Sequence, residues 1–264
     1  MMPTYLDRIL DTHRARAADD QRSLGSLVEA AQEMPPARGF RAALVDASTL
    51  DGIAVIAEVK RRSPSKGALA VNLDPAVLGA AYAAGGAACW SALTDVEFFG
   101  GSAADLAAAR AASGRPVLRK DFTVSANDVC DARLMGADCV LLIAAALDDT
   151  ELEAFHSLAR TVGLDALVEV HDEAELARAV AVGADLVGVN QRDLITFQVD
   201  QQRAVRMAPR MPSGVVRVAE SGIRGRADAR VLAAAGYHAL LVGESLVTAG
   251  DPAAAVADLR AAGR

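Results

Sequence analysis

The segment 53–67, IAVIAEVKRRSPSKG, joins a strand pattern to an acid and a base at its end. Side chains alternate between the two faces of a β-strand, so Glu58 and Lys60 point the same way from its C-terminal end. Burying a charged pair costs several kcal/mol unless the pair is well matched. The segment therefore indicates either a structural salt bridge or a site for acid–base chemistry.

Polar side chains recur where the later apolar runs end. They are Lys120, Glu169, Asn190, Glu220-Ser221-Gly222 and Gly243-Glu244-Ser245. With Glu58 and Lys60 of the first strand, Lys120 and Glu169 would place two lysines and two glutamates at one opening. A single buried charge is usually structural, but four on different strand ends favour a catalytic site. Carboxylate and ammonium groups tune each other there through proximity and burial.

Eight short apolar runs are expected to form strands. They lie at 53–59, 88–93, 117–120, 139–143, 166–170, 186–190, 215–219 and 239–242. Ala-rich helical patterns follow them at 74–84, 103–112, 127–135, 149–162, 172–182, 200–207, 226–235 and 251–261. Several of these helices begin with Asp or Asn, which cap free backbone N–H groups, and several end at Gly.

This alternation predicts an α/β protein with a parallel sheet and right-handed crossovers. Eight such units close into a (β/α)8 TIM barrel, which has its chemistry at the C-terminal strand ends. A doubly wound open sheet is the alternative, but the Gly-rich fingerprint expected after its first strand is missing from the sequence. Residues 1–48 are expected to form an N-terminal helical extension, and 49–264 the barrel, within one domain overall.

The last two strand ends carry small-residue turns, at 221–223 and 243–245. In such barrels the loops after strands seven and eight often bind phosphate, through backbone N–H groups that glycine lets approach closely. Ordinary turn chemistry explains either turn alone. The two together predict a phosphate site, to which Ser63 would add a hydroxyl donor.

Composition narrows the class of partner. The 264 residues carry a net charge of −7 and are 52% hydrophobic, which argues against non-specific binding to nucleic acid or anionic membranes. Cys89, Cys130 and Cys139 have no metal-like spacing, and no secretory signal or membrane-spanning run is visible. A reduced, cytoplasmic monomer or weak homodimer is expected. His13 and His156 are expected on helix surfaces.

Seven blocks of sequence, in order along nearly the whole chain, resemble the indole-3-glycerol-phosphate synthase family. The most specific is IAEVKRRSPSKG at 56–67. The others are SALTDVEFFGGS at 91–102, PVLRKDF at 116–122, ALVEVHDEAEL at 166–176, GVNQRDLITFQVD at 188–200, VAESGI at 218–223 and LVGESLV at 241–247. The family usually has a Pro-Tyr-Gln-like turn after KDF. Here SAND at 125–128 replaces it, which makes the rigidity of that loop a question for the structure.

The resemblance implies a lyase of tryptophan biosynthesis. Its substrate would be a small phosphorylated anion, 1-(2-carboxyphenylamino)-1-deoxyribulose 5-phosphate. Its products would be indole-3-glycerol phosphate, carbon dioxide and water. The resemblance implies no metal and no cofactor.

The resemblance also suggests roles for the matched residues. Lys120 would be the general acid of ring closure and Glu169 the base of dehydration. The remaining residues would orient or bind substrate. Glu58 and Lys60 would lie beside its polar groups, and Asn190 would bind a hydroxyl while holding Glu58. Glu220 and Ser221 would complete the polar base of the site, Phe122 and Leu194 would pack against the aromatic ring, and Arg192 would lie nearby. Ser63, Gly222, Gly243, Glu244 and Ser245 would hold phosphate, with the Glu244 carboxylate turned away from the anion.

The sequence leaves two alternative functions to consider. A phosphoribosylanthranilate isomerase-like enzyme would carry a Cys at the end of the first strand, where this chain has Glu58 and Lys60. A non-catalytic barrel that binds phosphometabolites would be expected to lose Glu58, Lys120 or Glu169, and all three are present.

Overall fold

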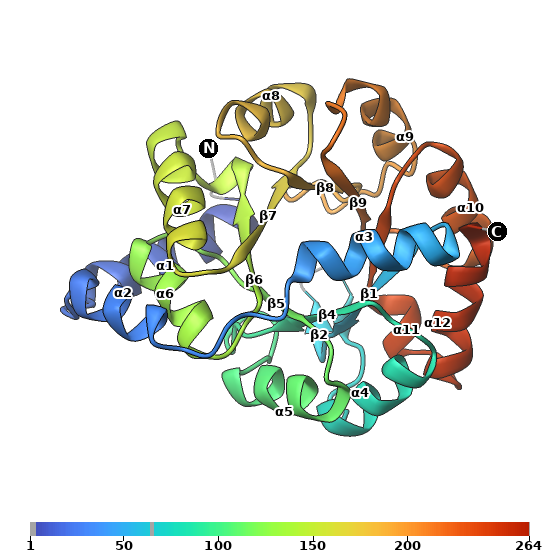
Figure 1. The fold of residues 1–264 in the computed structure, drawn as a ribbon, viewed down its shortest axis with the longest axis horizontal. Helices are drawn as coiled ribbons and strands as arrows, with labels where there is room; N and C mark the ends of the chain where they lie inside the picture. Colours follow the sequence, from blue (N-terminus) through green and yellow to red (C-terminus); the bar gives the residue numbers. More distant parts are fainter. Residues whose placement is uncertain (1–3, 64–65, 264) are drawn as a thin grey trace.

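A computed structural model describes residues 4–63 and 66–263. Eight strands form a closed parallel barrel in the order β1-β10-β9-β8-β7-β6-β5-β4 (Figure 1). They are β1 (Ala54–Val59), β4 (Cys89–Leu93), β5 (Val117–Lys120), β6 (Cys139–Ile143), β7 (Asp165–Val170), β8 (Leu186–Asn190), β9 (Val216–Glu220) and β10 (Ala239–Val242). The prediction of a (β/α)8 barrel is confirmed, with each strand end within one residue of its expected place.

Helices pack around the outside of the barrel (Figure 1). They are α4 (Pro75–Ala84), α5 (Ala103–Ser113), α6 (Ala126–Leu134), α7 (Asp149–Thr161), α8 (Glu173–Ala181), α9 (Arg203–Met207), α10 (Arg226–Ala234), the short α11 (Glu244–Val247) and α12 (Pro252–Arg260). The helix expected from residue 200 starts at Arg203, because the carbonyl and side chain of Asp200 accept the N–H groups of a turn at 202–203.

Strand alternation divides the core into two layers. Ala54 and Ile56 belong to the cluster that fills the barrel, while Val55 and Ala57 belong to the cluster between sheet and helices. The same alternation sends Glu58 to the interior side, at the open end of the barrel.

The N-terminal extension covers both ends of the barrel. It contains α1 (Tyr5–Asp19), α2 (Leu24–Gln32) and α3 (Phe40–Asp51), so the last helix runs past the expected boundary at residue 48. Figure 1 shows α3 lying across the barrel opening, where Phe40 and Leu44 join the interior cluster. The Arg41 N–H donates to Asp165 at the start of β7, so α3 closes the N-terminal end of the strands.

Two further features complete the described fold. The loop after β1 contains a short antiparallel pair, β2 (Arg62–Ser63) and β3 (Gly67–Ala68). Two residues of its SPSKG turn, Pro64 and Ser65, lie outside the described residues. No helix in the described part of the chain has the length and apolarity needed to cross a membrane.

The SAND segment is well anchored. Ser125 is the N-cap of α6, and its hydroxyl accepts the Asp128 N–H while the Asp128 carboxylate accepts the Ser125 N–H. This capping box satisfies two free donors reciprocally. It fixes the loop after β5, and with it the chain that follows Lys120, without the proline usual in the family.

Replacing the cap should therefore destabilise the protein. We expect Ser125→Ala to lower the free energy of unfolding by about 1 kcal/mol, the usual cost of losing an N-cap. Urea unfolding followed by circular dichroism measures the change. The control is Ser157→Ala, an exposed position on α7, where a shift below about 0.5 kcal/mol is expected. Equal shifts in both variants would contradict the role of the cap.

Candidate active site

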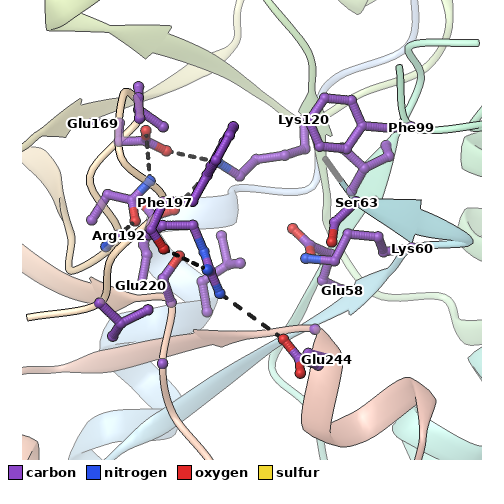
Figure 2. Close-up of a pocket in the computed structure, with 18 of the residues that line it drawn as sticks. Glu58, Lys60, Ser63, Phe99, Lys120, Glu169, Arg192, Phe197, Glu220 and Glu244 are labelled. Carbon is purple, nitrogen blue, oxygen red and sulfur yellow. Dashed lines mark hydrogen bonds and ion pairs between the residues drawn. The ribbon is translucent and has the colours of Figure 1, made fainter. Parts of the chain in front are cut away.

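A cavity of about 970 Å³ opens at the C-terminal ends of the strands (Figure 2). Every site residue expected from the sequence lines it. These residues are Glu58, Lys60, Ser63, Lys120, Phe122, Glu169, Asn190, Arg192, Leu194, Glu220, Ser221, Gly222, Gly243, Glu244 and Ser245. The barrel thus brings together side chains from six strand ends. What each residue does remains a prediction.

Lys120 lies between two buried carboxylates. Its Nζ is 2.7 Å from Glu169 Oε2 and 3.3 Å from Glu220 Oε2, and each acid is 1% exposed (Figure 2). Burial alone would lower the pKa of Lys120, but the negative charges of Glu169, Glu220 and Glu58 outweigh it and raise that pKa. The ammonium therefore keeps its proton at neutral pH.

The pKa values of the two carboxyl groups are shifted in opposite directions. Burial would raise the pKa of Glu169, but the charges of Lys120 and His171, with hydrogen bonds from Asn190 and Lys120, lower it. For Glu220 burial prevails, and the adjacent Glu169 charge adds to it, so the pKa is raised despite Lys120. An ionised and a protonated acid beside one ammonium is an arrangement suited to moving protons.

Glu58 and Lys60 form a second pair, with Lys60 Nζ 2.5 Å from Glu58 Oε1. Gly243 makes this geometry possible, because a Cβ there would lie 2.3 Å from Glu58 Oε1 and 3.1 Å from Lys60 Nζ. Gly243 therefore has a packing reason that the sequence did not reveal. Gly188 does the same for Glu220, since a Cβ there would lie 2.0 Å from Glu220 Oε1.

The expectation that Asn190 holds Glu58 is wrong. Its Nδ2 donates to Glu169 Oε1 at 3.0 Å, and its Oδ1 accepts the Arg192 N–H at 2.9 Å. The reason is strand order: β8 is hydrogen-bonded to β7, which carries Glu169, whereas β1 lies beyond β9 and β10. Asn190 supports Glu169 instead.

The loops after β9 and β10 form a compact corner. Ser221 and Gly222 both have left-handed φ values, 67° and 72°, and Ser221 is one of few non-glycine residues with such backbone in the described chain. Non-glycine residues seldom adopt this conformation, so the turn at Ser221 is conformationally constrained, which is common at functional sites. Ser245 Oγ donates to Ile223 O at 2.9 Å and ties the two loops together.

The expectation that the Glu244 carboxylate turns away from a bound anion stays a prediction. The carboxylate faces the cavity, 3.6 Å from Lys66 Nζ and 3.9 Å from Arg192 Nη2 (Figure 2). Two cations on facing loops attract it, which the position of Glu244 after β10 does not reveal. The same cations give this corner a positive lining that suits an anion.

The sequence did not reveal that α1 forms one wall of the cavity. Tyr5, Leu6 and Ile9 of α1 line it, together with Phe197 from the loop after β8. Phe99, from the loop after β4, also lines it, as its aromatic position after that strand already suggests. Tyr5 meets the Phe197 ring edge-on, with centroids 5.5 Å apart. The helical spacing of Leu6 and Ile9 marked an apolar face, but a spacing cannot say which surface that face covers.

His13 fixes α1 in this place, and the expectation that His13 lies on a helix surface is wrong. It is 8% exposed, its Nε2 lies 3.0 Å from Asp95 Oδ2 and 3.8 Å from Asp121 Oδ1, and its ring packs on Phe122. His156 is buried as well, at 5% exposure, because it faces the sheet side of α7.

His13, Asp95 and Asp121 are also the described cluster whose geometry could hold a metal ion. However, the Arg119 guanidinium lies 3.1 Å from Asp121 Oδ2 and already neutralises it. A positive neighbour opposes cation binding, so the cluster fits a structural ion pair between α1 and the strand ends better than a metal site.

Comparisons with known proteins agree on one family. The family model described as indole-3-glycerol phosphate synthase matches residues 6–259. Indole-3-glycerol phosphate synthase 1 of Streptomyces coelicolor is 52% identical over 262 residues, covering 98% of this chain and 96% of that protein. The Mycobacteroides abscessus indole-3-glycerol phosphate synthase is 50% identical, covering 98% and 95%.

Solved structures support the fold alone. A 3-hexulose-6-phosphate synthase matches with a TM-score of 0.61 at 19% identity, covering 80% of this chain and 99% of that one. A thiamine phosphate pyrophosphorylase from Pyrococcus furiosus matches with a TM-score of 0.60 at 17% identity, covering 81% and 96%.

Removing the His13 contact should loosen α1. We expect His13→Ala to reduce the protection of α1 amides against hydrogen exchange by about 1–3 kcal/mol, because Asp95 Oδ2 loses the His13 ring nitrogen in a buried position. Mass spectrometry of peptides from α1 measures the change. Asp11→Ala, an exposed position on the same helix, should leave that protection unaltered. Equal exchange in both variants would show that His13 does not hold the helix.

Proposed function

The chain belongs to the indole-3-glycerol phosphate synthase family of carboxy-lyases, and from this premise we propose how its residues perform the reaction. The enzyme acts in tryptophan biosynthesis on a phosphorylated small molecule, 1-(2-carboxyphenylamino)-1-deoxyribulose 5-phosphate. The isomerase and non-catalytic alternatives are not favoured by the family match. The assignment of each residue below is our proposal.

The substrate has an aromatic carboxylate at one end and a phosphate at the other, and the cavity has a matching polarity. The apolar wall contains Phe122, Leu194 and the α1 residues, which we propose pack against the anthranilate ring. The corner with Lys66, Arg192 and Arg224 lies on the side of the Gly222 and Gly243 loops. The phosphate would bind there.

Lys120 would act in ring closure. The anthranilate ring carbon attacks the ribulose carbonyl carbon, the C=O bond breaks toward oxygen, and the oxygen becomes an alkoxide. A preorganised ammonium stabilises that charge as it develops, and its effect is larger in a largely buried position such as this one. The raised pKa of Lys120 fits this role. It still permits transfer of a proton, because an alkoxide is a much stronger base than an amine.

Decarboxylation and dehydration then restore the aromatic ring. Carbon dioxide leaves with its bonding electrons staying on the ring, the new hydroxyl departs as water, and a proton is removed. Glu169, ionised and held by Asn190, would take that proton. Glu58 and Lys60 would orient the substrate, and the Lys60 ammonium would donate the proton that the departing hydroxyl needs. Glu220 and Ser221 would form the polar floor.

At the phosphate end, we propose that Ser63, Gly222, Gly243, Glu244 and Ser245 contact the anion, the last three through backbone N–H groups. The anion would compete with the Glu244 carboxylate for Lys66 and Arg192. Glu244 would then turn aside as the phosphate enters.

The oligomeric state and the cellular compartment of the protein are also proposals. We propose that the protein acts in the cytoplasm as a monomer or weak homodimer, and the net charge of −7 argues against nucleic acid or anionic membranes as partners. Light scattering on the purified protein distinguishes these two states.

The contact between Lys120 and Glu169 is the observation that supports this mechanism most strongly. We expect Lys120→Met to abolish turnover, because the alkoxide loses its ammonium, while the protein still folds, with lower stability, and still binds substrate. The measurement mixes protein with the substrate and follows indole fluorescence over time. Near-normal turnover in the variant would refute the role of Lys120, and a wild-type protein without turnover would refute the function.

Glu169→Gln should slow the reaction by ~10²-fold or more, the scale of a general base. The amide keeps the size and the hydrogen bond to Asn190 but cannot accept the proton. Steady-state kinetics with the same fluorescence signal measures the loss. Full activity would exclude Glu169 as the base.

Gly243→Ala should lower kcat/KM by about 5- to 150-fold. The added methyl meets Glu58 Oε1, and overpacking of this kind costs about 1–3 kcal/mol. Gly250→Ala is the matched control, since a Cβ there meets nothing within 4 Å among the described residues. If both variants behave alike, the close packing of Gly243 on Glu58 is not functional.

A further inference from the structure

Two buried carboxylates share one ammonium in this site, and their other neighbours must decide which of them is ionised. Glu169 and Glu220 each contact Lys120, at 2.7 and 3.3 Å. Two negative charges this close in a buried site repel strongly, so one acid tends to keep its proton. The aspartic-protease type of dyad shows the same logic.

The neighbours of the two acids are unequal. Besides Lys120, Glu169 has the Asn190 amide at 3.0 Å and His171 Nε2 at 3.6 Å, both facing Oε1. Glu220 Oε1 has no hydrogen-bond partner among the described residues and lies against the backbone of Gly188. Positive and donor groups therefore collect on Glu169.

Glu175 of α8 holds His171 in place on the side away from Glu169. Nδ1 of His171 lies 3.0 Å from Glu175 Oε2, and its backbone N–H donates to the same oxygen at 2.8 Å. Its other nitrogen, Nε2, is buried without a hydrogen-bond partner in the described chain and faces Glu169. Such contacts are often long in a ligand-free enzyme and tighten when substrate binds.

Charged groups act on His171 from three directions. Burial lowers the pKa of His171, and the positive charge of Arg203 on α9 lowers it further. The hydrogen bond to Glu175 and the negative charges of Glu169 and Glu175 outweigh both effects, so the pKa of His171 is raised. Its proton is therefore lost only at a higher pH than for an ordinary histidine. An imidazolium with a carboxylate on each side is the form that this geometry favours.

We propose that His171, oriented by Glu175, is a positioning residue that keeps the negative charge on Glu169 and leaves the proton of the pair on Glu220. His171 acts through Glu169 and makes no contact with the reacting atoms. The catalytic consequence rests on the proposed function, because Glu169 serves as a base only when it is ionised. The charge distribution itself does not depend on turnover.

The charge distribution can be measured directly by carboxyl ¹³C NMR of protein labelled at glutamate. The variants Glu169→Gln and Glu220→Gln assign the two resonances by their loss. In the wild-type protein at neutral pH we expect Glu169 at a carboxylate shift and Glu220 at a carboxylic-acid shift. In His171→Gln the two shifts should move toward each other, because Glu169 gains proton population and Glu220 loses it.

Two further variants sharpen the test. Glu175→Gln removes the charge behind the imidazole and should move the shifts in the same direction by less, so it serves if His171→Gln does not fold. His156→Gln replaces another buried histidine, on α7, and should move neither resonance. Unchanged shifts in both site variants, or an ionised Glu220 in the wild-type protein, would overturn the proposal.

Kinetics separate this proposal from the function itself. In His171→Gln we expect kcat to fall about 10-fold at neutral pH with KM changed much less, and the loss to deepen as pH falls, because Glu169 protonates more easily. An equal loss at every pH would indicate a merely structural histidine and contradict the proposal. A wild-type protein that forms no indole would refute the function, while the NMR result would stand unaffected.

Discussion

The buried ammonium of Lys120, placed between Glu169 and Glu220, is the constraint on which the rest of the site depends. These three residues come from β5, β7 and β9, and the closed barrel brings the ends of those strands to one opening. An unpaired charge in this position would be costly, and truncation of one partner would expose that cost. The fold therefore has to supply matched charges, close backbone approach and exclusion of water together.

Each of these requirements has a visible structural solution. Gly188 and Gly243 leave the space that the carboxylates of Glu220 and Glu58 occupy. The helix α1 covers the mouth and is tied to the strand ends through His13, while α3 closes the opposite end through Phe40 and Leu44. Of the two acids on Lys120, Asn190 and His171 contact only Glu169, so the chemically identical side chains of Glu169 and Glu220 differ in charge.

The sequence predicted what depends on local periodicity and strand order. Alternation placed Glu58 and Lys60 on one face, and the strand ends supplied Lys120, Glu169 and Glu220. The errors concern contacts between segments far apart in the chain. The resemblance suggested that Asn190 holds Glu58, yet the strand next to β8 is β7, which presents Glu169. Burial of His13 depends on how α1 docks onto the strand ends, and the position of the Glu244 carboxylate depends on cations from other loops. Neither dependence leaves a periodic signal in the sequence.

The most direct test of this account is the titration of the Lys120 side chain by ¹⁵N NMR of its ζ nitrogen, with Lys120→Met used to assign the resonance. Shared between two carboxylates, the ammonium should keep its proton beyond the ordinary lysine pKa of 10.5. A Lys120 that loses its proton below that value would mean that burial outweighs its partners. The charge arrangement on which the mechanism rests would then be wrong.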